Sequence, residues 1–411
     1  MIRAFITDGN LRSTLAVVRS LGRAGVWVGV GDDGPHPIAG TSRYCCESVL
    51  YPSPIKEPEA FQNFMRFELP KMGYTHLLAT SDVTVQLVAL LKEQLEPQVT
   101  VMTSSAEALN KVQDKAAMLE EARKIGIAVP LTITNCSRTE LLQFADEVGY
   151  PVVVKPRRSR QYCHGRWHTG SVSYAWTPAE VVDLYESCPI QFPLVQERVV
   201  GEGRGVFLLM WKGEIQAAFC HRRLREKPPW GGVSVLSESI PLDMTIVRQA
   251  ALLLRRMQWQ GPAMVEFKVD ERTGESKLME VNGRYWGSLQ LAIDAGVDFP
   301  AAHILLTCGE RITAQITYRT GVQCRWLLGD VDALISRLRV TPRQEMLCPQ
   351  SSSRAKVCAE FLRFLAPKLH YDVLSLRDPA PGWRELREYF AVNLQLAAHA
   401  LVEDRPQGEI V

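Results

Sequence analysis

Short apolar runs alternate with amphipathic segments over the first hundred residues. The runs that predict β-strands are 2–7, 25–30, 76–80 and 99–102, and the spacing of apolar positions predicts helices at 13–21 and 83–91. A strand–helix–strand rhythm is typical of a parallel sheet with helices on its faces. The sequence therefore begins with a predicted α/β domain.

Two loops of this domain follow strands at the edge where parallel sheets bind their ligands. They are Asp8–Arg12 and Thr80–Asp82. Neither contains the GxGxxG turn of a dinucleotide site, so a Rossmann oxidoreductase is not expected. Asp82 is a candidate substrate contact. The alternative is that the polar residues of both loops only form turns and helix caps.

The pattern changes after Ser104. Two helical stretches rich in Ala, Leu, Lys and Glu fill 106–125, and a glycine and a proline end the second one. An apolar strand, 150–155, ends in Lys155 and leads into a basic loop, 156–171. Strands and helices then alternate to about residue 309, and the remainder contains helical segments.

The strongest local pattern is a predicted β-hairpin at 264–282. Residues 264–270 alternate between apolar and polar, 271–275 can close a turn, and 276–282 form the return strand. If Asp270 lies opposite Ser276, then Glu266 lies opposite Glu280.

Two carboxylates at such adjacent positions repel each other. Mg²⁺ would offset this repulsion, because it accepts one or two carboxylates together with phosphate oxygens. Asn282 adds a neutral oxygen on the same face as Glu280, and Arg284 follows where it could bind a phosphate. We therefore predict a metal site here. The alternative is a solvated polar face with a chance pair of glutamates.

Composition and charge narrow the class of protein. The 411 residues are 46% hydrophobic and 22% charged, with a net charge of +2. These values indicate a folded chain of more than one domain and no nucleic-acid partner. No apolar segment approaches the length of a membrane span and the N-terminus lacks a signal-peptide pattern, so a cytoplasmic location is expected. The ten cysteines contain no CxxC pair and are expected to be reduced.

The hairpin motif resembles the metal-binding end of the ATP-grasp superfamily. The resemblance rests on Glu266-(x13)-Glu280-x-Asn282-x-Arg284, followed by SLQLAIDAGVDFP. In that family a Glu or Gln and then Glu-x-Asn bind the Mg²⁺ ions that bridge the ATP phosphates, and the Arg contacts phosphate or substrate. The resemblance implies that Glu266, Glu280 and Asn282 hold Mg²⁺ (or Mn²⁺) and that Arg284 is catalytic.

Three upstream segments resemble the same family in order and spacing: NKVQDKAAMLEEARKIGIAVP, GYPVVVKP and LVQERVVGEGRGVFLL. The first two imply that Lys115 and Lys155 bind the phosphates of ATP, Lys155 also acting in catalysis. The third resembles the hinge between two ATP-grasp lobes, where adenine and ribose are bound. The residues that it supplies are Gln196, Glu197, Arg198, Val199 and Glu202.

A second basic stretch, 221–239, is a candidate contact for substrate or phosphate. It combines cationic side chains with a Gly-Gly turn, whose N–H groups suit an anion. The alternative is a solvated basic loop. The candidate residues are Arg222, Arg223, Arg225, Gly231 and Gly232. The loop after Lys155 is richer in Arg and His than the family's Gly/Ser-rich lid, which indicates an acidic or phosphorylated substrate.

The resemblance covers about 1–310 and implies a division into four parts. We expect an α/β and α+β fold. A Rossmann-like preATP-grasp domain (1–105) precedes a two-lobed ATP-grasp fold with a small lobe (106–195) and a large lobe that holds the metal site (196–310). A mainly helical C-terminal extension (311–411) follows.

The activity implied by the resemblance is that of an ATP-dependent carboxylate–amine ligase. Transfer of the γ-phosphoryl group would convert a carboxylate into an acyl phosphate, and an amine would then form an amide. The expected partners are a small-molecule acid and amine, and a homodimer is compatible with the sequence. Two alternatives stay open. One is an ATP-grasp kinase or carboxylase acting on a small acidic substrate, and the other is a nucleotide-binding module without catalysis.

Overall fold

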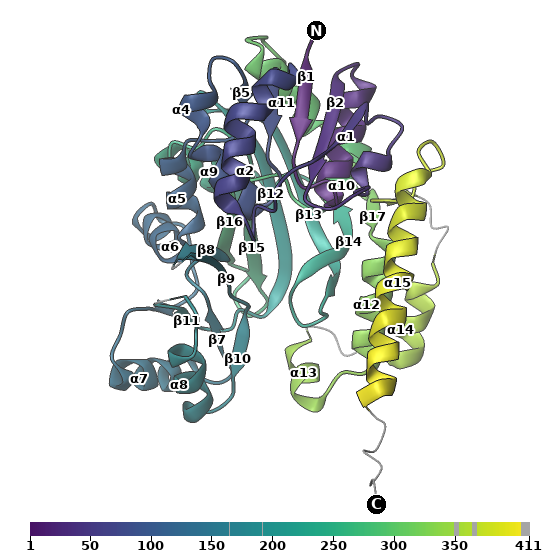
Figure 1. Cartoon of the computed structure of the whole chain (residues 1–411). Helices are drawn as coiled ribbons and strands as arrows, with labels where there is room; N and C mark the ends of the chain where they lie inside the picture. Colours follow the sequence, from purple (N-terminus) through teal and green to yellow (C-terminus); the bar gives the residue numbers. More distant parts are fainter. Residues whose placement is uncertain (164, 191, 349–352, 364–367, 404–411) are drawn as a thin grey trace, which may run out of the picture.

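The computed structural model describes residues 1–163, 165–190, 192–348, 353–363 and 368–403. Within these residues the strands form three larger sheets and one separate two-stranded hairpin. Figure 1 shows the N-terminal sheet at the top beside the long strands of the largest sheet, with the small sheet and its two helices below. The last helices lie along the opposite side.

The N-terminal sheet is parallel, in the order β3-β2-β1-β4-β5. Its strands are β1 (Arg3–Ile6), β2 (Trp27–Asp32), β3 (Glu47–Leu50), β4 (His76–Leu78) and β5 (Thr100–Val101). The helices between them are α1 (Arg12–Arg23), α2 (Pro58–Asn63), α3 (Asp82–Ala89) and α4 (Lys92–Leu95). The predicted parallel α/β sheet is confirmed. The pattern did not predict β3, because its ESVL sequence contains no apolar run.

The second sheet is small and antiparallel, in the order β10-β7-β11-β6. Its strands are β6 (Thr132–Ile133), β7 (Val152–Lys155), β10 (Ser173–Ala175) and β11 (Leu194–Gln196). The helices α5 (Ala106–Gln113) and α6 (Lys115–Lys124) precede it, and α7 (Arg138–Val148) and α8 (Pro178–Glu186) pack on it. Part of the predicted basic loop is a hairpin of β8 (Arg160–Cys163) and β9 (Arg166–Thr169).

The largest sheet has the order β16-β15-β12-β13-β14-β17-β18. Its strands are β12 (Gly201–Trp211), β13 (Glu214–Lys227), β14 (Val233–Ser239), β15 (Gly261–Asp270), β16 (Ser276–Asn282), β17 (Gln323–Arg325) and β18 (Leu369–Tyr371). The accompanying helices are α9 (Met244–Arg256), α10 (Leu289–Ala295) and α11 (Phe299–Thr307). Both main hydrophobic clusters combine side chains of this sheet with side chains of the N-terminal domain. The largest sheet is therefore packed firmly against that domain.

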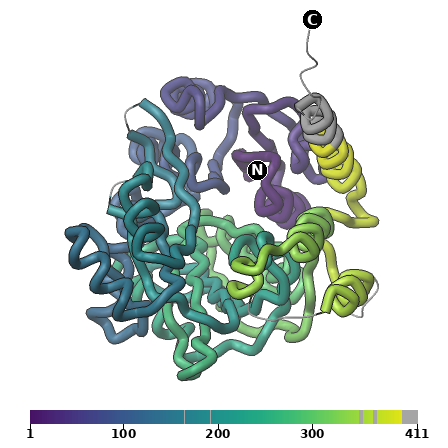
Figure 2. Tube along the Cα trace, turned by 90° about the horizontal axis from the view of Figure 1, so that it is seen from below, coloured from purple at the N-terminus to yellow at the C-terminus, as the bar shows by residue number. Residues whose placement is uncertain are grey.

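The C-terminal region contains α12 (Leu327–Leu338), α13 (Pro342–Leu347), α14 (Arg354–Phe361) and α15 (Ala380–Glu403). It is helical as predicted in these segments, but it also supplies β17 and β18 to the largest sheet. Figure 2 shows α15 beside the N-terminal domain. There the Arg384 side chain donates to the carbonyl of His36 at 2.9 Å.

A buried arginine fastens the C-terminal region to the N-terminal domain. Arg19, on α1, is only 4% exposed. Its Nε donates to Asp378 Oδ2 at 2.9 Å, and its Nη atoms donate to the carbonyls of Asp372 (3.0 Å) and Val373 (2.8 Å). The Ser42 hydroxyl donates to the same Asp378 oxygen at 2.7 Å. Asp372, Val373 and Asp378 are themselves buried, and their contacts with Arg19 matter because an unpaired buried charge costs several kcal/mol.

Helices in the described part of the chain were also compared with the length and hydropathy of a membrane span. No single one of them is long and apolar enough. The bent pair α10 and α11, with an angle of 91° between them, passes by length and composition only.

His221 and His303 are the two most deeply buried histidines of the described residues. Burial lowers the pKa of His221 and of His303 to about 3. The His221 ring packs edge-on against Phe207, with ring centroids 4.6 Å apart, and neither of its nitrogens has a hydrogen-bond partner among the described residues. His303 Nδ1 lies 3.2 Å from the hydroxyl of Tyr285. Both side chains are therefore neutral in the folded protein at neutral pH.

We expect the free energy of unfolding to fall as the pH drops from about 6.5 towards 3. Both pKa values are lower in the folded chain than in the unfolded one, so only the unfolded chain binds these two protons in this range. Each histidine contributes a slope of up to about 1.4 kcal/mol per pH unit. Urea unfolding at pH 7.5, 6.0 and 5.0 measures the slope. His221→Phe should reduce it, and exposed His36→Asn should not. Equal slopes for wild type and His221→Phe would contradict this expectation.

Candidate functional site

The predicted hairpin is present, and its return strand has the predicted bounds, Ser276–Asn282. Glu266 lies opposite Glu280, which confirms that part of the prediction. The assumed pairing of Asp270 with Ser276 is wrong, because Ser276 lies opposite Val269. The register at the turn is thus shifted by one residue, although the two glutamates still meet.

A β-bulge reconciles these two observations. Phe267 lies opposite Leu278, and the next pair is Glu266 with Glu280, so Met279 is an extra residue in the second strand. The carbonyl of Met279 accepts a hydrogen bond from Lys155 Nζ at 3.4 Å. The bulge restores the facing position of Glu280 and supplies an acceptor to the lysine at the end of β7.

Asn282 joins the two carboxylates. Its Nδ2 donates to Glu266 Oε1 at 3.1 Å and to Glu280 Oε1 at 3.2 Å. The amide hydrogens bring partial positive charge between two carboxylates that would otherwise repel each other. The three side chains that the sequence assigned to a metal site therefore lie within hydrogen-bonding reach of one another.

The guanidinium of Arg223 forms an ion pair with the Glu266 carboxylate. Arg223 Nη2 donates a hydrogen bond to Glu266 Oε2, and Nη1 donates one to Glu226 Oε1 at 3.1 Å. Arg223 comes from β13 and Glu266 from β15, two strands of one sheet separated by β12. Burial raises the pKa of Glu266 despite this arginine, and the neighbouring Glu280 adds to the rise.

Two lysines, at the start of α6 and at the end of β7, lie near Glu280. Lys115, the first residue of α6, lies 3.6 Å from Glu280 Oε2, and its Nζ donates to Ser159 Oγ at 2.8 Å. Burial acts to raise the pKa of Glu280, but Lys115 and Lys155 outweigh it and hold that pKa below its usual range. Burial and the nearby Lys115 lower the pKa of Lys155 to about 8. A lysine at a helix N-terminus opposes the helix dipole, so the position of Lys115 serves its contacts rather than the helix.

The donor set fits a hard divalent cation that is shared with phosphate. Within the residues that the structure describes, no three or more His, Cys, Asp or Glu side chains form a metal-binding group. Two carboxylates and one amide oxygen leave ligand positions for phosphate and water, which is how Mg²⁺ is usually held. Lys115 and Lys155 lie beside the carboxylates, where phosphate charge would need to be neutralised.

The predicted hinge connects the small sheet to the largest one. Gln196 ends β11 and is buried, and its Nε2 donates to Thr132 Oγ1 at 2.6 Å. Glu197 Oε1 accepts from Lys277 Nζ at 2.5 Å and from the N–H of Leu131 at 3.1 Å. Glu197 therefore connects the small sheet to β16, the second strand of the hairpin that carries Glu266 and Glu280.

The other three hinge candidates have separate environments. Arg198 Nη2 donates to the carbonyl of Leu347 at 3.0 Å, on the last turn of α13. The carbonyl of Val199 accepts from Lys268 Nζ at 3.3 Å. Glu202 accepts from Arg204 Nε at 2.8 Å. Their predicted roles as nucleotide contacts remain predictions.

Arg284 makes a contact across the domain boundary. Its Nε donates to Asp82 Oδ1 at 2.7 Å and its Nη2 to Asp82 Oδ2 at 3.0 Å. Asp82 is the first residue of α3, which Ser81 caps through a hydrogen bond from the N–H of Thr84. Burial acts to raise the pKa of Asp82, but Arg284 outweighs it and lowers that pKa. The N-terminal domain thus fixes the orientation of Arg284.

The arginines of the basic stretch on β13 contact acidic residues in different parts of the structure. Arg223 alone of its predicted arginines is bonded to the hairpin glutamates. Arg222 Nη2 lies 2.6 Å from Glu238 Oε2, and Arg225 Nη2 lies 2.6 Å from Asp330 Oδ2 on α12. These two arginines form ion pairs with acidic residues that lie outside the β15–β16 hairpin.

The Gly231–Gly232 turn folds back on its own strand. Gly231 has a φ of +130°, and its N–H donates to the carbonyl of Pro228 at 3.2 Å. A Cβ on Gly232 would lie 2.2 Å from the carbonyl oxygen of Lys227, so glycine is required there by close approach. The Tyr174 hydroxyl donates to the carbonyl of Trp230 at 3.1 Å and joins the turn to the small sheet.

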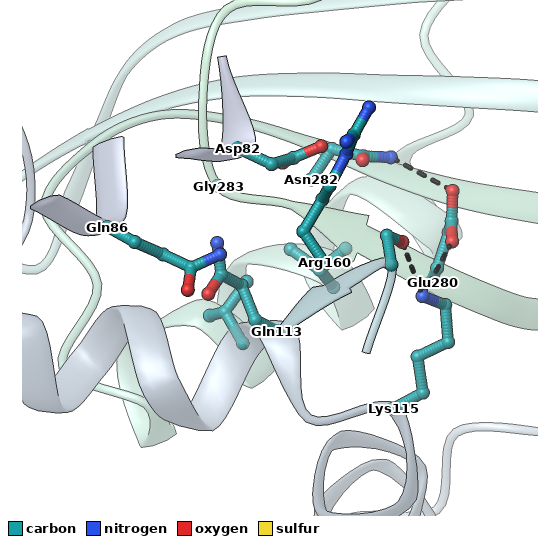
Figure 3. Close-up of a pocket in the computed structure, with 11 residues that line it drawn as sticks. Asp82, Gln86, Gln113, Lys115, Arg160, Glu280, Asn282 and Gly283 are labelled. Carbon is teal, nitrogen blue, oxygen red and sulfur yellow. Dashed lines mark hydrogen bonds and ion pairs between the residues drawn. The ribbon is translucent and has the colours of Figure 1, made fainter. Parts of the chain in front are cut away.

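A pocket of about 360 Å³, open mouth included, lies between the N-terminal domain and the hairpin (Figure 3). It brings together four predicted residues from separate parts of the chain: Asp82, Lys115, Glu280 and Asn282. Sequence reasoning missed four polar lining residues: Gln86, Gln113, Ser159 and Arg160. The glutamines occupy ordinary helix positions, and the arginine is one of several in the basic segment, so no local pattern singles them out.

Comparison with known proteins shows which proteins this chain resembles. A family model described as "ATP-grasp in the biosynthetic pathway with Ter operon" matches residues 191–329, which contain the metal hairpin. The carbamoyl phosphate synthase large chain of a Thermus thermophilus strain is 28% identical over 229 residues, or 52% of this chain and 21% of that one. The chain thus spans about a fifth of the length of that relative.

Two solved structures share the fold. The L-amino acid ligase of Bacillus licheniformis has a TM-score of 0.60 at 14% identity, over 79% of this chain and 78% of that one. The biotin carboxylase domain of Hydrogenobacter thermophilus 2-oxoglutarate carboxylase, solved with MgADP, ADP and bicarbonate, has a TM-score of 0.61 at 16% identity, over 78% and 73%. The family model, the sequence relative and this common fold make the chain similar to proteins of the ATP-grasp superfamily.

Proposed function

We propose that the chain is an ATP-dependent carboxylate–amine ligase that works through an acyl phosphate. The observation that carries this proposal is the meeting of Glu266, Glu280 and Asn282 with Lys115 and Lys155. This arrangement has oxygen ligands for a cation on one side and positive charges for phosphate on the other. Lys115, Glu280 and Asn282 line one pocket together with Asp82, the partner of Arg284.

In this proposal the chain's residues bind and neutralise charge. Glu266, Glu280 and Asn282 hold Mg²⁺ (or Mn²⁺), which when bound neutralises charge on the phosphate oxygens. Lys115 and Lys155 bind the phosphates of ATP, and the hinge from Gln196 to Val199, with Glu202, contacts adenine and ribose. Arg284 stabilises charge at the acceptor carboxylate.

The reaction proceeds in two balanced steps. A carboxylate oxygen attacks the γ-phosphorus, the bond to the β,γ-bridging oxygen breaks, and ADP and an acyl phosphate result. The amine nitrogen then attacks the acyl carbon, the bond to the phosphate oxygen breaks, and the products are an amide, phosphate and the proton of the amine. A carboxylate is a poor electrophile, and the phosphate leaving group is what makes the second step accessible.

Carboxylation is the second candidate. The observation in its favour is the similarity in fold to a biotin carboxylase domain that was solved with bicarbonate. In that case the acceptor carboxylate would be replaced by bicarbonate, and phosphate release would depend on bicarbonate.

Hydroxylamine trapping distinguishes the two candidates. The protein is incubated with ATP, Mg²⁺, hydroxylamine and pools of carboxylic acids that include amino acids, and ADP, phosphate and hydroxamate are measured. A ligase yields hydroxamate in proportion to ADP. Bicarbonate-dependent phosphate without hydroxamate supports carboxylation. Phosphorylated product without phosphate release would identify a kinase and reject the ligase.

Asp82→Asn is expected to lower kcat about tenfold with less than a twofold change in ATP affinity. The substitution removes the charge that holds Arg284, and a charge-assisted hydrogen bond is worth about 1.5–3 kcal/mol. Steady-state ADP release and binding of a non-hydrolysable ATP analogue measure the two quantities. Asp183→Asn, on the exposed side of α8, is the matched control. A large loss of ATP affinity with unchanged kcat would reject a positioning role for Asp82.

A further inference from the structure

The two lysines near Glu280 stand on separately packed parts of the chain. Lys115 begins α6, whose apolar residues belong to the cluster that combines the N-terminal domain with the largest sheet. Lys155 ends β7, whose Val152 and Val154 belong to a separate cluster with side chains of α7 and α8. The two positive charges also repel each other. Contacts other than a shared hydrophobic core therefore keep both lysines beside the hairpin.

Polar contacts join the segment that follows Lys155 to the start of α6. The N–H of Lys115 donates to the carbonyl of Arg157 at 3.0 Å, and Lys115 Nζ donates to Ser159 Oγ at 2.8 Å. Figure 3 shows the Lys115 side chain pointing towards Glu280 from this junction. The segment that carries one lysine is thus bonded to the main chain and to the side chain of the other.

Asp114 adds a negative charge to this junction. Arg157 Nε donates to Asp114 Oδ1 at 2.8 Å, and Arg158 Nη2 lies 3.7 Å from Asp114 Oδ2. The same carboxylate caps α6 by accepting from the N–H of Ala117 at 3.1 Å. Burial acts to raise the pKa of Asp114, but the hydrogen bond from Arg157 outweighs it and lowers that pKa. A cap needs only an oxygen acceptor, which asparagine also has, so the charge itself serves the arginines.

A negative charge at this place opposes the binding of phosphate. Asp114 directly precedes Lys115 in the chain, and in the proposed function the ATP phosphates bind at Lys115 and Lys155. A carboxylate close to phosphate weakens its binding by repulsion. The ion pairs of Asp114 with the two arginines give this carboxylate a role that offsets the repulsion.

We propose that Asp114 is a positioning residue: through Arg157 it holds the segment after Lys155 against α6, so that both lysines face the same phosphates. The inference rests on the proposed function only in placing the ATP phosphates at Lys115 and Lys155. Asp114 itself does not touch ATP, and its effect on binding passes through the two lysines.

Binding of a non-hydrolysable ATP analogue to the full chain with Mg²⁺ tests the sign of this effect. Asp114→Asn keeps the cap and removes the charge. We expect its Kd for the analogue to rise about tenfold, the equivalent of one charge-assisted hydrogen bond. The Kd for adenosine, measured by competition against a fluorescent ATP analogue, should change by less than about twofold. Glu107→Gln, which removes the exposed partner of Lys111 on α5, is the matched control and should leave both values unchanged.

A double-mutant cycle tests the route through Arg157. Arg157→Gln should also raise the Kd for the ATP analogue about tenfold, and the double variant should bind no more than about threefold more weakly than the weaker single variant. Losses that multiply to about a hundredfold would show that the two residues act independently, which would overturn the inference.

Two results for Asp114→Asn alone would also overturn it. An unchanged or lower Kd for the ATP analogue is what removal of a charge that only repels phosphate would give. Equal losses for the ATP analogue and for adenosine would show a merely structural role for Asp114.

Hydroxylamine trapping tests the ligase separately. The expected binding pattern with no hydroxamate from any acid would keep the positioning role and reject the ligase. Hydroxamate formation with an unchanged Kd in Asp114→Asn would keep the ligase and reject the positioning role. A wild-type chain that does not bind the ATP analogue would overturn both.

Discussion

Glu280→Gln is expected to reduce ATP turnover by at least about a hundredfold. Glu280 accepts from Asn282 and faces Lys115, and its pKa is held low, so it is a carboxylate at neutral pH. Glutamine keeps the size of the side chain but removes the charge that would bind the cation and balance the lysines. Loss of one preorganised electrostatic contact typically costs about 10²–10³ in kcat.

Measurement of ADP release against Mg²⁺ concentration checks this expectation. The Mg²⁺ concentration for half-maximal turnover should rise and kcat should fall in the same variant, because in the proposal the Glu280 carboxylate both binds the cation and balances the charge of the lysines. Glu275→Gln, exposed in the turn of the same hairpin, controls for the loss of one negative charge. Activity within threefold of wild type in Glu280→Gln would remove this residue from the site.

Arg223→Met is expected to destabilise the metal-free protein far more than the metal-loaded one. Arg223 donates hydrogen bonds to Glu266 and to Glu226, and it is the positive charge that faces the partly buried Glu266 carboxylate. Removing one partner of a buried charge pair typically costs about 3–5 kcal/mol. A bound divalent cation would supply the missing charge and recover a large part of that loss.

Urea unfolding at pH 8 tests this coupling, with and without Mg²⁺ and a non-hydrolysable ATP analogue. The alkaline pH matters because burial raises the pKa of Glu266, and protonation at lower pH would relieve the repulsion by itself. Arg255→Met, whose partner Glu214 is exposed, should change stability by less than about 1 kcal/mol in both conditions. An equal loss with and without ligand would show that Arg223 has only a structural role.

The hairpin shows how far the sequence predicted this site. Alternation of polar residues identified both strands, the turn and the facing glutamates. The bulge at Met279 was not predictable from alternation, because an extra residue in one strand changes the period only locally. The register assumed from the sequence was wrong by one residue at the turn. The bulge at Met279 shifts the second strand by one residue in the opposite sense, so Glu266 lies opposite Glu280 as predicted.

Contacts between distant segments were beyond the sequence pattern. The pairing of Arg284 with Asp82 joins residues 202 positions apart, and that of Arg223 with Glu266 joins two strands separated by a third. Gln86 and Gln113 become neighbours in a pocket only after α3 and α5 have packed on the hairpin. Periodicity identifies which face of an element is polar, but not which other polar face will meet it. The parallel N-terminal sheet was predictable because strands that alternate with helices along the chain typically pair in parallel.

The attachment of residues 372–378 to α1 bears on how this protein can be divided for engineering. A fragment that stops near residue 310, where the resemblance to the family ends, would lack β17 and β18 and leave the edge of β14 open to pairing with other chains. It would also leave the Arg19 guanidinium buried in the N-terminal domain without its hydrogen-bond acceptors. Residues 1–310 are therefore not an independent folding unit that could be exchanged between proteins. Chimeras with proteins of similar fold need to carry the C-terminal region together with the N-terminal one, as a matched pair.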